Sequence, residues 1–136
     1  MDNQFETKRL SVAPDAVAPD GSDVRVLLGL KSGGAAHFEL APGQTAVAVR
    51  HRTVEEIWFF LEGRGEMWRE QDGREEVVPV ERGVCLTIPL GTKFQFRSFG
   101  YEPLAAIGFT CPRWPGKGEA IPVQGKWDPT IPPGEG

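Results

Sequence analysis

The 136-residue sequence is poor in several residue types and patterns, and each shortage excludes a class of protein. It has only two cysteines, Cys85 and Cys111, which are too few for a disulfide framework and lack the spacing of a metal-binding cluster. No apolar run is long enough to span a bilayer, and the N-terminus lacks the apolar core of a signal peptide. With a net charge of −4, the chain has no excess of basic residues with which to bind nucleic acid. We therefore expect a cytoplasmic protein without a membrane or nucleic acid partner, whose cysteines are free, buried thiols.

The residues that are present indicate one globular domain built from short strands. Hydrophobic residues make up 40% of the chain and charged residues 25%, which is typical of a soluble protein with a real core. The 17 glycines and 12 prolines separate short apolar segments instead of forming low-complexity runs. Asp72-Gly73 lies between two of these segments and predicts a hairpin, because such a tight turn requires positive φ. The sequence therefore predicts an all-β fold without helices.

The sequence predicts three parts of the chain with different structures. Residues 1–22 form an N-terminal arm with one strand near 9–12, and residues 23–111 form a barrel. Residues 112–136 form an extension rich in Pro and Gly that packs on the barrel, with Trp114 and Trp127 as its anchors. The strands expected in the barrel are 24–30, 35–40, 45–51, 56–62, 66–70, 74–80, 84–88, 94–99 and 104–110.

The segment 56–62 is apolar on both of its faces. Because side chains alternate along a strand, Glu56, Trp58 and Phe60 share one face, which we expect to point into the barrel. The opposite face carries Ile57, Phe59 and Leu61. That second apolar face requires a covering layer, either the terminal arms or another subunit. We therefore expect a homodimer.

Two segments resemble the paired motifs of the cupin superfamily, a group of small jelly-roll barrels of the double-stranded β-helix type. The first cupin motif runs Gly, five residues, His-x-His, three or four residues, Glu, six residues, Gly. This sequence matches it at Gly43, His51, Glu56 and Gly63. The second cupin motif begins Gly, five residues, Pro-x-Gly, and this sequence matches it at Gly83, Pro89 and Gly91. The resemblance covers residues 24–111 and implies a jelly-roll barrel.

The same resemblance implies a metal site of three histidines and one glutamate, and this sequence departs from it. Val49 and Phe94 stand where that site has histidines, and Ser98 stands where the second motif has asparagine. Only His51 and Glu56 remain, and they are the residues that would hold a metal if one is bound. Because a first-row metal is held by three or four protein ligands, we expect no metal cofactor, although a divalent metal is the alternative.

One further histidine bears on this choice. His37 lies in the segment 35–40 and would become a third ligand only if its face pointed inward. We expect it to point outward.

A buried glutamate inside an aromatic barrel requires a partner. An ionised Glu56 among Trp58, Phe60, Phe94 and Phe96 would cost several kcal/mol unless it were paired or protonated. His51 is the partner we expect, and the two side chains are the candidate acid and base of a catalytic pair. The alternative is that the pair is structural or orients a ligand.

The residues that replace the metal ligands make the barrel more apolar, which favours a small-molecule pocket. The expected walls are Val49, Trp58, Phe60, Phe94 and Phe96, and the expected polar points are Thr45, His51 and Glu56. Three hypotheses remain open. The first is a metal-independent protein that binds a small, partly apolar molecule, with or without acid–base chemistry. The others are a metal-dependent enzyme of isomerase or oxygenase type with an atypical ligand set, and a structural or regulatory dimer with a filled barrel.

Overall fold

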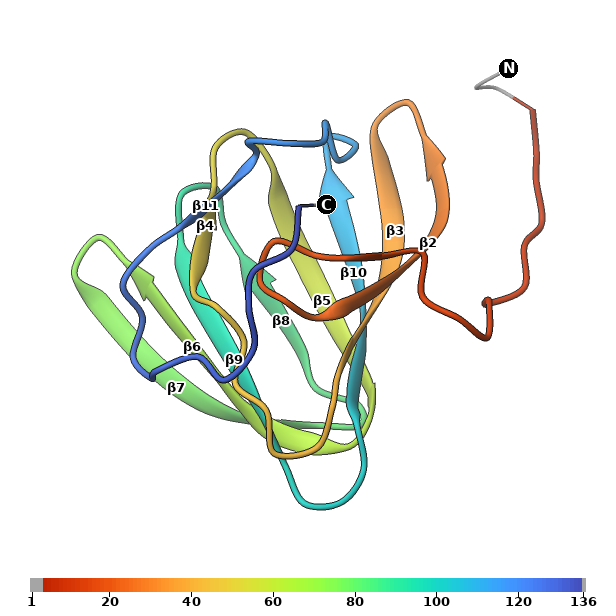
Figure 1. The fold of residues 1–136 in the computed structure, drawn as a ribbon. Coiled ribbons are helices and arrows are strands. Elements are labelled where there is room, and N and C mark those ends of the chain that lie inside the picture. Colours follow the sequence, from red (N-terminus) through yellow and green to blue (C-terminus); the bar gives the residue numbers. More distant parts are fainter. Residues whose placement is uncertain (1–3, 136) are drawn as a thin grey trace.

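The computed structural model describes residues 4–135, and these residues form eleven strands and no helix. The strands are β1 (Ala16–Val17), β2 (Asp23–Leu30), β3 (Gly33–Leu40), β4 (Val49–His51), β5 (Glu55–Glu62), β6 (Arg64–Gln71), β7 (Arg74–Glu81), β8 (Cys85–Ile88), β9 (Lys93–Phe99), β10 (Leu104–Cys111) and β11 (Ala120–Pro122). They make two antiparallel sheets in the orders β1-β2-β3-β10-β5-β8 and β11-β4-β9-β6-β7. The sheets face each other as a jelly-roll barrel (Figure 1), which confirms the predicted fold class.

The strands of the barrel lie close to where the sequence predicts them. The hairpin between β6 and β7 turns at Asp72 and Gly73, which both have positive φ, as the Asp-Gly signal requires. Two of the strand predictions are wrong. The segment 45–51 is a strand only in β4, because the backbone of residues 45–48 bonds in turn to Arg97, Phe96, Asp20 and Val123 and so follows no single neighbour.

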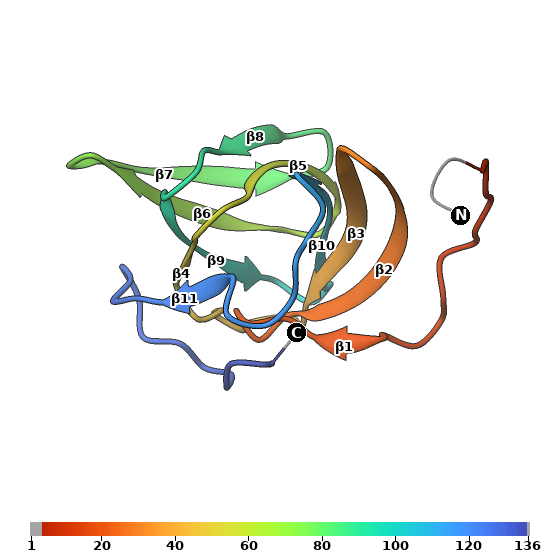
Figure 2. The ribbon, with the colours of Figure 1, turned by 90° about the horizontal axis from the view of Figure 1, so that it is seen from above.

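The other wrong prediction is the strand near 9–12. The carbonyl groups of Ser11 and Val12 accept hydrogen bonds from the Arg25 side chain instead of from a neighbouring strand. The first strand comes later, at β1, which pairs with β2. The arm before it lies outside the barrel, beside β2 (Figure 2), to which Lys8 also donates a hydrogen bond at the Val26 carbonyl.

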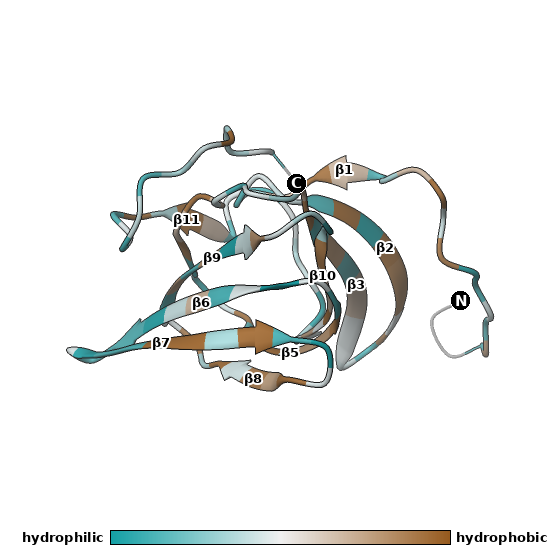
Figure 3. Ribbon diagram, turned by 90° about the horizontal axis from the view of Figure 1, so that it is seen from below, coloured by the Kyte–Doolittle hydropathy of each residue, from teal (hydrophilic) through white to brown (hydrophobic). Residues whose placement is uncertain are grey.

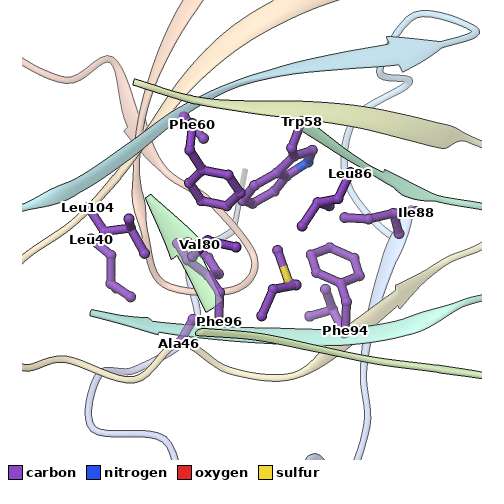
Figure 4. Close-up of a cluster of buried hydrophobic side chains, with 13 residues drawn as sticks. Leu40, Ala46, Trp58, Phe60, Val80, Leu86, Ile88, Phe94, Phe96 and Leu104 are labelled. Atoms are coloured by element: carbon purple, nitrogen blue, oxygen red, sulfur yellow. The ribbon is translucent and has the colours of Figure 1, made fainter. Parts of the chain in front are cut away.

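The core lies between the two sheets (Figure 4). Its largest fully buried side chains include Trp58, Phe60, Phe94 and Phe96, which project from β5 and β9 toward one another. Along β5, Glu56, Trp58 and Phe60 are buried and the residues between them are exposed, as the face analysis predicts. The core is therefore built from the inward faces of the two sheets, and Glu56 lies on the same inward face as Trp58.

The outer face of the six-stranded sheet is only partly covered within one chain. Ile57, Phe59 and Leu61 are 47%, 42% and 37% exposed, so the terminal arms do not cover them as one alternative proposed. The strand β2, next to the short edge strand β1, is also mostly hydrophobic (Figure 3). The other alternative, a second subunit, stays a prediction.

The prediction of buried cysteines is wrong, since both thiols are exposed. Cys85 alternates with the buried Leu86 along β8 and so points outward, and Cys111 ends β10 opposite the exposed Glu55. No helix long and apolar enough to cross a membrane occurs in residues 4–135.

The C-terminal extension is part of the sheet structure. Its strand β11 pairs with β4, so it flanks the strand that carries His51. Trp127 is an anchor, as predicted: its ring lies over the Arg97 guanidinium at 4.1 Å, and its backbone exchanges hydrogen bonds with the Gln95 side chain. Trp114 has a different position, described below.

Candidate functional site

A cavity of about 310 Å³ opens between the inward faces of the two sheets, and it is lined by residues of β1, β2, β3, β5 and β10 from one sheet and of β4, β9 and β11 from the other. Its walls are mainly apolar. The residues that matter for its chemistry are Phe38, Val49, His51, Glu56, Trp58, Phe94 and Trp114. They come from β3, β4, β5, β9 and the extension, so the site is assembled from segments far apart in the sequence.

His51 and Glu56 meet in this cavity. The alternation of β4 puts Val49 and His51 on the inward face, and the turn at 52–54 brings β5 back so that Glu56 faces inward as well. His51 Nδ1 lies 3.8 Å from Glu56 Oε1, which is within ion-pair range but longer than a hydrogen bond. The hydrogen bond to Glu56 Oε1 comes instead from the indole Nε1 of Trp58, at 3.0 Å. The partner expected for Glu56 is therefore close, but Trp58 makes the direct contact.

Burial governs the charge of both groups. Desolvation raises the pKa of Glu56 to about 8, although the Trp58 hydrogen bond opposes the change. Desolvation also lowers the pKa of His51 to about 4, against the opposing charge of Glu119. Each shift favours the uncharged form, so at neutral pH the cavity holds a protonated carboxyl group beside a neutral imidazole.

The predicted pocket residues divide between an open and a filled part of the barrel. Val49, Trp58 and Phe94 line the cavity. Phe60 and Phe96 do not, because they are packed in the core beyond Trp58. Thr45 is not among the lining residues either, since its backbone is bonded to Thr130 of the extension. The barrel is thus neither wholly open nor wholly filled.

The donor set does not fit the metal site that the resemblance implies. Val49 and Phe94 face each other across β4 and β9 and have no lone pair to donate. His37 lies on the outer face of β3, opposite Arg25 and Ile107, whereas its neighbour Phe38 stacks on Trp58 inside the barrel at 5.0 Å. No three His, Cys, Asp or Glu side chains gather into a metal-binding group within residues 4–135. Two donors are too few to hold a first-row metal tightly.

The sequence analysis did not place three residues at the site that the structure brings there. Trp114, expected to be an anchor, packs edge-on against His51 with ring centroids 5.0 Å apart. Asp20 belongs to the N-terminal arm and nevertheless lines the cavity as a buried acid. Glu119 accepts hydrogen bonds from Thr53 and Val54 and so holds the turn that follows His51. No motif marks these residues, because the terminal segments that carry them reach the site only by folding back.

Comparison with known proteins supports the fold. Residues 36–109 match the cupin domain family. Among solved structures, an uncharacterized conserved protein with a double-stranded β-helix domain from Klebsiella pneumoniae is 16% identical with a TM-score of 0.63, over 86% of this chain and 90% of that one. KdgF from Halomonas sp. is 17% identical with a TM-score of 0.62, over 74% of this chain and 89% of that one.

A third similar structure belongs to a much longer chain. Oxalate decarboxylase from Bacillus subtilis is 16% identical with a TM-score of 0.68, over 80% of this chain but only 29% of its own. That enzyme has Mn(II) centres. No curated protein matches the sequence. At these identities the structural likeness shows the fold alone.

Proposed function

The chain belongs to the cupin domain family, and on that premise we propose that it is a metal-independent member that binds a small, partly apolar molecule in its barrel. One observation carries the proposal: a mainly apolar cavity of about 310 Å³ lies beside two buried polar side chains, His51 and Glu56. Apolar walls with a few convergent polar groups are the usual form of a small-molecule site. A purely structural barrel would gain stability by filling this space.

Titration with benzyl alcohol, followed by tryptophan fluorescence, tests the binding. Trp58 and Trp114 both line the cavity, so an occupant should change their emission. V49F places a larger side chain in the cavity and should abolish the change. V77F makes the same substitution at a partly exposed position of β7 and should leave the change intact. A response that survives V49F would show that the probe binds elsewhere.

Metal analysis tests the other half of the proposal. Protein purified without chelator is expected to carry no stoichiometric divalent metal, because no three His, Cys, Asp or Glu side chains of residues 4–135 converge into a metal-binding group. Stoichiometric metal that disappears in H51A would overturn the proposal in favour of a metal-dependent enzyme of isomerase or oxygenase type.

The neutral pair favours a second candidate, acid–base chemistry on the bound molecule. A protonated Glu56 has a proton to give, and a neutral His51 can accept one at Nδ1, which has no hydrogen-bond partner among the described residues. Deuterium exchange from solvent into a bound ligand, followed by NMR, tests this candidate. Both H51A and E56Q should abolish the exchange, whereas simple binding would show none even in the unchanged protein.

The location proposed for the protein is the cytoplasm. Cys85 and Cys111 are both free and exposed. Exposed thiols persist in a reducing compartment and are prone to oxidation outside it.

A further inference from the structure

The charged groups that line the cavity are arranged with the acids inside. Within residues 4–135 they are Asp20, Glu56 and Arg113, beside the neutral His51. Asp20 and Glu56 are only 5% and 4% exposed. Arg113 is exposed and its side chain lies against Gly29 of β2, so closely that a Cβ added at this glycine would be 3.0 Å from the arginine Nε. The deep wall of the cavity is therefore acidic, and the lining guanidinium lies on the solvent side.

The deep wall also offers acceptors that the described residues leave unused. Glu56 Oε1 accepts the Trp58 indole hydrogen bond. Asp20 Oδ1 takes both hydrogen bonds from Ser22, at 2.9 Å from its backbone nitrogen and 2.6 Å from its hydroxyl. His51 Nδ1 is buried and has no hydrogen-bond partner in residues 4–135, although it lies 3.8 Å from Glu56 Oε1. A ligand atom that donates two hydrogen bonds would satisfy both His51 and Glu56.

Aromatic rings surround these acceptors. Phe38 stacks on Trp58, and Phe94 and Trp114 pack edge-on against His51. Such walls bury an apolar skeleton favourably, and ring faces attract a cation more strongly when water is excluded. The aromatic walls and the acidic deep wall therefore both favour a ligand that combines an apolar skeleton with a positive charge.

We propose that the ligand of this cavity is a small primary or secondary amine on an apolar skeleton, with its nitrogen bound between Glu56 and His51 Nδ1 and Asp20 as the second acid. This inference rests on the proposed function and names its ligand class. An ammonium group carries the donors that the wall lacks. Its positive charge favours the ionised form of Glu56, so amine binding is coupled to the release of the Glu56 proton. An alcohol oxygen donates only one hydrogen bond. A carboxylate ligand would face two acids at the deep end, with Arg113 too far toward solvent to pair with it there.

Three probes of one shape separate these ligand types. Benzylamine, benzyl alcohol and benzoate are titrated into the protein at neutral pH by isothermal calorimetry. Benzylamine is expected to bind at least about tenfold more tightly than benzyl alcohol, because it forms a charge-assisted hydrogen bond in a buried site. Benzoate is expected to bind most weakly.

Two variants assign the preference to the acid. E56Q keeps the shape of the side chain but removes its charge, and it should bring the affinity for benzylamine close to the affinity of the same variant for benzyl alcohol. E55Q changes the neighbouring, exposed glutamate of β5 and should behave as the unchanged protein. D20N should lower the affinity for benzylamine by a smaller factor. If circular dichroism shows that E56Q is unfolded, D20N is the variant that tests whether an acid of the cavity causes the amine preference.

The outcomes separate this inference from the function on which it rests. Benzyl alcohol binding without an amine preference, a preference for benzoate, or an amine preference that survives both E56Q and D20N would overturn the amine assignment and leave the binding function standing. If none of the three probes binds, the amine assignment and the binding function both fail.

Discussion

The interior of the barrel has two parts that use the same strands for opposite purposes. At one end, Phe60, Met67 and Phe96 are fully buried in the core and do not line the cavity. At the other end, His51 and Glu56 border a cavity. Trp58 lies between the two parts and contacts rings on both sides. The two ends therefore have different roles. The packed end stabilises the fold, whereas the other end keeps buried polar groups whose desolvation costs stability.

The largest expected effect comes from comparing two phenylalanines of these parts. F60A removes a ring that is enclosed on all sides and should lower the free energy of unfolding by about 3–5 kcal/mol. F94A removes a ring that already borders the cavity, so fewer contacts are lost and the decrease should be smaller. Urea denaturation measures both values. Equal losses would contradict the division of the interior.

The next largest effect on stability is expected from a variant that restores the missing metal ligands beside the cavity. Val49 and Phe94 are direct partners between β4 and β9, and Val49 shares its face with His51. V49H/F94H should therefore complete a set of three imidazoles with Glu56 and bind a divalent metal. At a metal concentration a hundred times the dissociation constant, the gain in stability is about 2.7 kcal/mol. Thermal unfolding with and without Zn²⁺ measures it, and V49H alone is the control that should gain little. No gain in the double variant would show that the inward faces do not converge as described.

The pH dependence of stability should also distinguish the open end. The raised pKa of Glu56 means that the folded state holds its proton up to about pH 8, whereas the unfolded state releases it near 4.5. The Glu56 contribution to stability is therefore full below 4.5 and falls as pH rises through 8. The lowered pKa of His51 acts in the opposite direction, so its contribution is full above 6.5 and falls as pH drops through about 4.

Between pH 4.5 and 6.5 these two trends oppose each other, and above 6.5 only the Glu56 trend remains. Stability should therefore fall by about 2 kcal/mol from pH 6.5 to 8, at about 1.4 kcal/mol for each pH unit. Urea denaturation across this range measures the fall. E56Q should flatten the curve, and E55Q should not, because Glu55 is exposed. The same fall in both variants would show that another group is responsible.

The smallest effect on the single chain is expected on the outer face of β5. F59Q changes a ring that is partly exposed, so unfolding of the monomer should change by only about 0.5 kcal/mol. If a second copy covers this face, as the sequence predicts, the variant should convert a dimer to a monomer. Light scattering coupled to gel filtration measures the mass. A monomeric mass for the unchanged protein would contradict the homodimer.

The strands were predictable from the sequence because their signals are local. Asp72-Gly73 can be recognised as a turn without knowing what surrounds it, and the alternation in 56–62 separates an inward from an outward face by geometry alone. The prediction of buried cysteines failed because the general tendency of free thiols was applied without regard to the alternation of β8, which places Cys85 outside. The irregular path of residues 45–48 was not predictable, because their hydrogen-bond partners are distant in the sequence and leave no local signal.

The candidate site was predictable only in part. The spacing of the first motif placed His51 and Glu56 in one barrel, and the substitution of Val49 and Phe94 removed two metal ligands from that barrel. These are properties of residue type and of position along two strands, and they need no coordinates.

Only the tertiary structure decided what surrounds the pair. It brought Trp114 onto the ring of His51 and Asp20 into the cavity wall, and it gave the hydrogen bond of Glu56 to Trp58. It also placed the boundary between packed core and open cavity at Trp58, so that Phe60 lies in one part and Glu56 in the other, although both share a face of β5. The physical reason is that strand periodicity fixes the direction of a side chain, whereas the volume left around it depends on segments that are distant in the sequence.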